Sequence, residues 1–191
     1  WQADRKQGAN TLTIQFGHAL DIFCHCVGNF SEFSAQVSTQ IPQWYEPDTG
    51  RMVEVDSPDN VIISGHLQNG AAASLHSAAV PHFPDGLHLE IHGRKGTIVV
   101  TQSQMAQMSP VRIEGAREGE NELRELTIPD KFFWVSKDIP RGPPFNVAQA
   151  YTCFAESIMR NRAVEPNFDT GLKLHELLAM IEKSSIEGQR I

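Results

Sequence analysis

An Asn-Gly pair between two alternating segments constrains the fold of this chain more than any other feature. Residues 61–68 and 71–79 both alternate apolar and polar side chains, which is typical of a half-buried β-strand. Asn69 and Gly70 join the two segments, and both residue types tolerate the positive φ angles that a tight hairpin turn requires. Since a tight hairpin connects antiparallel strands, the sequence predicts an antiparallel sheet in the middle of the chain.

Helical patterns lie on both sides of this sheet. Apolar residues at helical spacing predict a helix over residues 8–28, with Asn10 as its N-cap and Gly28 as its end. A second helix follows a possible cap at Asn146, with one apolar face made of Val147, Tyr151, Phe154, Ala155 and Ile158. A third helix begins at Asp169 or Thr170 and ends at Gly188.

Short strands fill the space between the helices. Further strands are predicted at residues 30–41, 52–55, 87–92, 97–101, 111–114 and 123–128. The breaker-rich residues 42–50 are expected to form a loop, and the polar residues 102–110 a surface excursion. Strands gathered beside segregated helices predict an α+β fold, with a mainly antiparallel open β-sheet and helices packed on one face. We expect residues 1–191 to form one such domain.

The charge balance and the cysteines exclude several classes of function. With 16 Lys and Arg against 23 Asp and Glu, the net charge is -7, which argues against nucleic-acid binding. No apolar run approaches the ~18 residues of a membrane span, so no membrane partner is expected. An odd count of 3 cysteines without framework spacing favours a reducing compartment, and we expect a cytoplasmic protein.

Five segments in order carry a resemblance to a known family. They are GANTLTIQFGHALD at residues 8–21, SPDNVIISGHLQNGAAASLH at 57–76, LHLEIHGRKGTIVV at 87–100, GPPFNVAQAYTCFAESI at 142–158, and the closing FDTGLKLHELLAMIEKSSIEGQRI. Together they resemble the C-terminal domain of the Gfo/Idh/MocA oxidoreductase superfamily, in its galactose-regulon-repressor-like branch.

The resemblance implies a substrate-binding and oligomerisation domain that normally follows an N-terminal Rossmann domain holding NAD(P). No G-x-G-x-x-G opens a βαβ unit in this sequence. We therefore expect no dinucleotide-binding domain and no cofactor in this chain, with NAD(P) present only if an N-terminal Rossmann domain exists. The chain is then either a fragment of a longer protein or a natural reduced form.

His18 is the best catalytic candidate. The resemblance implies a helix that carries Asp and, four residues later, His, which together relay a proton during hydride transfer. His18 fits the His position, whereas Ile14 stands at the Asp position and cannot titrate. Gln15 can hydrogen-bond a substrate but cannot act as a base. Asp21 could orient His18, although a structural role is favoured.

Two other clusters resemble metal sites. His88, Glu90 and His92 alternate along one predicted strand and share one face, but three ligands along a strand cannot readily converge on one ion. Residues 24–26 read Cys-His-Cys, yet consecutive helical residues diverge by 100°, so core cysteines are the better interpretation. We therefore predict no metal site.

Aromatic side chains in irregular segments can line an apolar pocket at the sheet edge. His82 and Trp134 are the favoured candidates, and with Gln15 and His18 they make up the predicted substrate-binding set for a small molecule.

Three functions remain open. The first is the substrate-binding and oligomerisation domain of an NAD(P)-dependent oxidoreductase-like protein, not a competent dehydrogenase by itself. The second is a stand-alone, cofactor-independent isomerase or cyclase of the secondary-metabolism type, in which His18 acts in an apolar pocket. The third is a non-catalytic ligand-binding regulatory module. In each case apolar surface needs a cover, and we expect a homodimer through the sheet.

Overall fold

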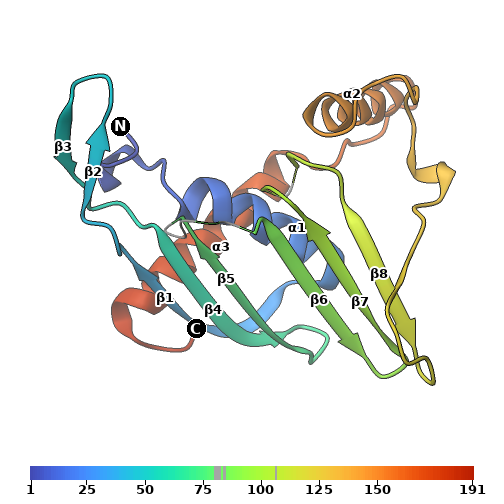
Figure 1. Ribbon diagram of the computed structural model, residues 1–191, viewed down its shortest axis with the longest axis horizontal. Helices are drawn as coiled ribbons and strands as arrows, with labels where there is room; N and C mark the ends of the chain where they lie inside the picture. Colours follow the sequence, from blue (N-terminus) through green and yellow to red (C-terminus); the bar gives the residue numbers. More distant parts are fainter. Residues whose placement is uncertain (80–82, 84, 106) are drawn as a thin grey trace. The chain divides into compact units, whose positions relative to one another are not determined.

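The computed structural model describes residues 1–79, 83, 85–105 and 107–191 (Figure 1). The chain forms two compact units, each described by itself below. The first unit comprises Trp1–His82 with Phe168–Ile191, and the second comprises Phe83–Asn167. The prediction of a single domain stays a prediction.

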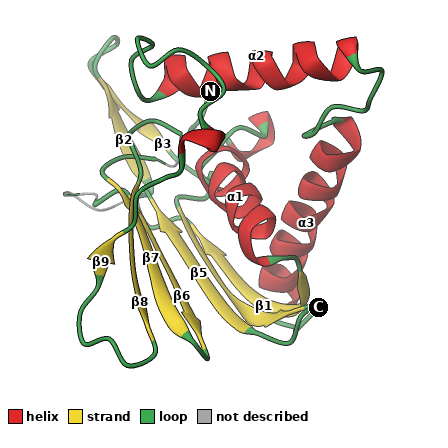
Figure 2. Cartoon of the chain, turned by 90° about the vertical axis from the view of Figure 1, so that its right-hand side faces the viewer, coloured by secondary structure: helices red, strands yellow, loops and turns green. Residues whose placement is uncertain are grey.

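The first unit pairs an antiparallel sheet with two helices. In chain order its elements are η1 (Arg5–Gln7), the π-helical turn η2 (Leu12–Phe16), α1 (Gly17–Val27), β1 (Phe30–Ser38), β2 (Gln43–Glu46), β3 (Arg51–Glu54), β4 (Asn60–Leu67), β5 (Ala72–Ala78) and α3 (Phe168–Glu187). The main sheet has the order β1-β4-β5, and β2 and β3 form a separate two-stranded sheet. Helices α1 and α3 lie together on one face of the main sheet (Figure 2). The predicted α+β class with an antiparallel sheet is confirmed.

The core of the first unit lies between those helices and the sheet. The helices contribute Leu12, Phe16, Leu20, Phe23, Leu178 and Ile181, and the strands contribute Phe30, Phe33, Val61, Ile63 and Leu67. Gly65 permits the close pairing of β4 with β1, because a Cβ atom there would lie 2.1 Å from the Glu32 carbonyl oxygen and 2.7 Å from the Phe33 Cα. Helix α1 thus buries the apolar face that its sequence predicts, except that Cys26 is exposed rather than in the core.

The outer edge of β1 is covered by the C-terminal segment. The Phe33 N–H donates to the Ile191 carbonyl (2.8 Å) and the Ile191 N–H donates back (2.9 Å). Further along the strand, the Ala35 N–H donates to Ser184 Oγ (3.0 Å) and the Val37 N–H to Ser185 Oγ (2.8 Å). These bonds satisfy the polar groups of an edge strand that would otherwise invite pairing with another chain.

Strand β1 ends at Ser38, three residues before the predicted end. The buried carboxylate of Asp59 accepts hydrogen bonds from the backbone N–H groups of Gln40 and Ile41, both at 2.8 Å. A carboxylate that takes up these donors replaces the strand ladder, so the chain turns away from the sheet.

Two turn predictions need correction. Residues 42–50 are not all loop, because Gln43–Glu46 pairs as β2 with β3 and only the residues after it form the turn. In the β4–β5 hairpin Gly70 has φ 85°, but Asn69 does not take a positive φ. Asn69 instead uses its side chain, which accepts from the Ala71 N–H (3.0 Å) and donates to the Val27 carbonyl (3.1 Å).

The second unit contains the other sheet. Its elements are β6 (Leu87–Gly93), β7 (Gly96–Gln102), β8 (Arg112–Arg117), β9 (Arg124–Glu125), η3 (Asp130–Phe132) and α2 (Pro143–Met159). The four strands pair antiparallel in the order β6-β7-β8-β9. The predicted hairpin around residues 93–96 is confirmed, with Gly93 paired to Gly96.

Helix α2 begins at Pro143 rather than after Asn146. Proline suits the first helical turn, because its missing N–H has no partner there in any helix. The Asn146 side chain donates instead to the Gln107 carbonyl (2.9 Å). The segment predicted as a surface excursion is therefore tied to the start of α2.

Candidate functional site

The start of α1 holds two of the predicted site residues. Asn10 caps this region as predicted, since its Oδ1 accepts from the Thr13 N–H (3.2 Å) while Thr13 Oγ1 accepts from the Asn10 N–H (3.1 Å). The first turn is π-helical, with the Phe16 N–H donating to the Thr11 carbonyl five residues back. The sequence gives no indication of this wide turn, which contains Gln15 and often marks functional sites in helices.

His18 lies on the solvent side of α1. The buried face of the helix is made of Phe16, Leu20 and Phe23, and at 100° per residue His18 points away from it. Its side chain is exposed, and among the described residues it has no hydrogen-bond partner. The same holds for the half-buried Asp21, so the structure gives no support to Asp21 as the group that orients His18. An exposed imidazole with both nitrogens open can donate to, or accept from, a bound substrate.

The Cys-His-Cys run does not form a site. Burial, together with the nearby Asp21 charge, raises the pKa of the Cys24 thiol to about 11, so this thiol is uncharged at neutral pH. Cys26 lies on another flank of the helix and is exposed. Among the residues that the structure describes, no group of three or more His, Cys, Asp and Glu side chains could hold a metal ion.

The His-Glu-His triplet forms a ladder along β6. His88 Nε2 lies 2.9 Å from Glu90 Oε1, and His92 Nε2 lies 3.1 Å from Glu90 Oε2. The imidazoles thus contact different oxygens of one carboxylate rather than converging on a shared point. Hydrogen bonds from His88 and then His92 lower the pKa of the exposed Glu90 carboxyl. This arrangement is an exposed polar ladder.

Trp134 belongs to the second unit and is held by its own loop. Its indole Nε1–H donates to the Lys131 carbonyl (3.0 Å), and its backbone N–H donates to Gln149 Oε1 (2.6 Å). The side chain is 53% exposed, so the ring face can contact a ligand while its polar group is already used. His82 lies outside the described residues. That Trp134 and His82 share a pocket with His18 stays a prediction.

Helix α2 has two different faces. On one face Phe145 is buried against Phe133 (ring centroids 5.9 Å apart), and the Arg141 guanidinium lies over both rings at 4.2 and 4.3 Å. Gln149, one turn along, donates to the Phe132 carbonyl (3.0 Å). The opposite face carries the apolar residues that the sequence predicted as a helix face, and they are exposed. It includes an apolar hollow lined by Val147, Ala150, Tyr151 and Phe154.

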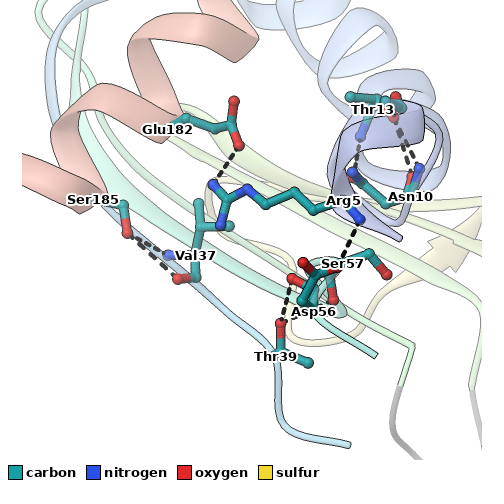
Figure 3. A network of polar contacts seen from close by, with 10 residues as sticks. Arg5, Asn10, Thr13, Val37, Thr39, Asp56, Ser57, Glu182 and Ser185 are labelled. Atoms are coloured by element: carbon teal, nitrogen blue, oxygen red, sulfur yellow. Dashed lines mark hydrogen bonds and ion pairs between the residues drawn. The ribbon is translucent and has the colours of Figure 1, made fainter. Parts of the chain in front are cut away.

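A polar network anchors the first residues of the chain to the first unit (Figure 3). The Arg5 N–H donates to Asp56 Oδ1 (2.7 Å), and its guanidinium forms an ion pair with Glu182 of α3 (2.7 Å). Thr39 Oγ1 donates to the Ser57 carbonyl (2.9 Å). The Ser57 hydroxyl itself is buried with no partner in the described part of the chain. These bonds hold the first residues of the chain to the rest of the first unit.

None of the helices among the described residues is long and apolar enough to cross a membrane.

The fold defines a class, namely an α+β domain that corresponds to about half the length of the solved structures it resembles. The profile of the family "Gal80p, C-terminal domain" matches residues 1–102, more than half of the chain. The chain belongs to this family, and the resemblance inferred from the sequence is confirmed.

Individual proteins agree with this assignment. An uncharacterized oxidoreductase of Synechocystis sp. is 26% identical over 191 residues, which is 98% of this chain and 50% of that protein. The super-repressor mutant of Gal80p from Saccharomyces cerevisiae is similar in structure, with a TM-score of 0.78 and 20% identity over 96% of this chain and 50% of its own. A complex of levoglucosan dehydrogenase with NADH and levoglucosan has a TM-score of 0.81 and 21% identity over 100% of this chain and 52% of its own. The chain thus spans about half the length of the relatives it matches.

Proposed function

We propose that this chain is the substrate-binding and oligomerisation half of an NAD(P)-dependent oxidoreductase-like protein, and that it is not a competent dehydrogenase by itself. The observation that carries the proposal is that the chain matches only about half the length of its relatives. The whole chain matches about half of an oxidoreductase and half of a dehydrogenase that was captured with NADH. A protein of this kind needs a second half to hold the nicotinamide.

The substrate class follows from the same relatives. Levoglucosan dehydrogenase forms complexes with NADH and levoglucosan and with NADH and L-sorbose, both of which are carbohydrates. We therefore propose a small, polar, sugar-like substrate. The exposed His18 of α1 and the half-buried Gln15 of the preceding turn η2 carry hydrogen-bonding groups that suit hydroxyl groups.

His18 is the residue that we propose for proton transfer. An imidazole is the usual general acid or base near neutral pH. Ile14 and Gln15, on the preceding turn, cannot take up a proton, so His18 would act without a helix-mate carboxylate four residues before it.

The test uses the natural gene product. We expect it to bind NADH, measured by fluorescence, and to oxidise or reduce a sugar-like compound, followed by nicotinamide absorbance. His18→Ala should lower turnover by about 10²-fold or more and leave NADH binding unchanged. His25→Ala, an exposed histidine on the same helix, should change neither. Turnover without nicotinamide, or an active His18→Ala variant, would refute this assignment.

A regulatory module is the second candidate, and Ile14 favours it. The family's namesake, Gal80p, is described as a transcriptional regulator in Kluyveromyces lactis. A chain with no titratable group at position 14 could bind a nicotinamide and a sugar without turning the sugar over. Ligand binding by calorimetry combined with no detectable turnover in the natural protein would support this candidate over the dehydrogenase.

Homodimerisation through the sheet also remains a proposal. The sheet of the second unit offers a suitable apolar face, on which Ile91 pairs with Ile98 and Leu89 with Val100. Ile98 is 41% exposed there. We expect Ile98→Asp to weaken a dimer measured by sedimentation equilibrium. A monomer at micromolar concentration in the unsubstituted protein would rule out a stable dimer.

A further inference from the structure

The outer face of α2 carries a stripe of exposed apolar side chains. The stripe consists of Val147, Tyr151, Phe154 and Ile158, which are 54%, 70%, 49% and 63% exposed. The residues recur at intervals of four, three and four, so they lie in one row along the helix. A row of this kind on a water-exposed helix marks an interaction surface, because its exposure to water is unfavourable.

The two faces of α2 rule out a simple rotation of the helix that would bury the stripe. Phe145, Gln149 and Glu156 lie on the side opposite to the stripe, at 100° per residue. Phe145 is buried there, and Gln149 bonds the backbone of Phe132 and Trp134. Turning the helix would break these contacts, so the stripe needs a cover from outside this packing.

The hollow on the stripe specifies the shape of that cover. Its four lining residues are Val147, Ala150, Tyr151 and Phe154, which stand at positions i, i+3, i+4 and i+7. Four residues at these positions form the hole that receives one side chain of a facing helix in knobs-into-holes packing. Ala150 makes the hole deep enough, since its side chain ends at Cβ. No charged residue lines the hole, so the entering side chain should be aliphatic.

The small size of the stripe favours a partner in the same polypeptide over a separate protein. Four side chains on one helix are fewer than the ~20–30 residues per side of a stable complex between free proteins. An interface within one chain can be smaller, because tethering raises the effective concentration of the two surfaces. Relatives of this chain carry about as much sequence again outside the matched half, and some were captured with NADH. Dinucleotide-binding α/β domains have helices on both faces of their sheet.

We propose that the stripe on α2 is the surface on which a dinucleotide-binding half of the natural protein packs, with one of its helices placing an aliphatic side chain in the hollow. This inference rests on the proposed function. It makes α2 a docking helix between two halves of one protein, fixed to the substrate-binding half by its inner face and to the cofactor-binding half by its outer face.

Hydrogen exchange of α2 amides tests the proposal. In the natural gene product we expect the amides of residues 147–158 to exchange about tenfold or more slowly than in the 191-residue chain alone. Tyr151→Glu should restore the fast exchange, because it places a charge on the packed surface. Met159→Glu adds the same charge on the same helix at a 77% exposed residue away from the stripe, and it should leave the protection intact. Tyr151→Ser removes the same apolar ring without adding a charge, and it should also restore the fast exchange.

The outcomes separate this inference from the proposed function. A longer protein that binds NADH but exchanges α2 amides as fast as the 191-residue chain would overturn the docking role and leave the function standing. A natural product near 21.2 kDa would overturn both. Protection that grows with the concentration of the 191-residue chain, and that Tyr151→Glu abolishes, would assign the stripe to a second copy and overturn the proposal.

Discussion

Helices α1 and α2 have similar sequence patterns and opposite surroundings. Both carry large apolar residues at helical spacing along one face. In α1 that face is buried, with Leu20 at 0% exposure, as is Phe16 at the end of the preceding turn η2. In α2 the corresponding face is open, with Tyr151 70% exposed. The difference teaches that the periodicity of apolar residues predicts which face of a helix is apolar. It does not predict which part of the protein, or which partner, packs against that face.

The variant with the largest expected effect removes a buried side chain at the start of α1. Phe16→Ala should lower the free energy of unfolding by about 3–5 kcal/mol, because it removes a fully buried aromatic ring and leaves a cavity. Chemical denaturation followed by circular dichroism measures the change. A loss below about 1 kcal/mol would mean that α1 is no better packed than α2.

The edge of β1 should give an intermediate effect. Ser184 Oγ accepts from the Ala35 N–H and donates to the Gln189 carbonyl (2.6 Å). Ser184→Ala removes the partner that both backbone groups find at the buried Ser184 side chain, at a cost of about 1–3 kcal/mol. The exposed Ser64→Ala on β4 is the matched control, with an expected change within about 0.5 kcal/mol. Equal changes in the two variants would contradict the role given to Ser184.

Thiol reactivity compares two flanks of α1. Since the pKa of Cys24 is raised to about 11, its reactive thiolate stays scarce at pH 8 and increases as the pH approaches that value. We expect iodoacetamide to modify the exposed Cys26 about tenfold or more faster than Cys24, as measured by peptide mass spectrometry. Asp21→Asn should speed the Cys24 reaction, because the Asp21 charge helps to raise this pKa. Similar rates at both cysteines would place Cys24 in a more polar setting than the structure shows.

The smallest effect belongs to the outer face of α2. In the 191-residue chain Tyr151→Ala should change the free energy of unfolding by no more than about 0.5 kcal/mol, because the ring packs against little. The same denaturation measurement applies. A loss near that of Phe16→Ala would show that the stripe is already covered in this chain and would remove the contrast between the two helices.

Two of the hairpins and most element types could be predicted from the sequence. The hairpins at Gly70 and residues 93–96, the Asn10 capping bond and the end of α1 at Gly28 all rest on local chemistry that a sequence displays. The shortened β1 could not be predicted, because the Asp59 carboxylate that ends it is about twenty residues away. The covered edge of β1 depends on Ser184 and Ser185, which are more distant still.

The candidate site was predictable only in part. The exposure of His18 follows from the burial of Phe16 and Leu20, a pattern visible in the sequence. The wide turn around Gln15, and the lack of a hydrogen-bond partner for His18 among the described residues, depend on the folded structure. The hollow on α2 could have been found from the sequence, since a small Ala150 among larger apolar residues at i, i+4 and i+7 is the composition of a knob-receiving hole.

The intact mass of the naturally expressed protein tests the central claim most directly. The claim is that this chain is one half of an oxidoreductase-like protein. It predicts a mass above 21.2 kDa by a further domain of roughly 120–150 residues. A natural product of 21.2 kDa would contradict it, and the search would then turn to cofactor-free chemistry at His18.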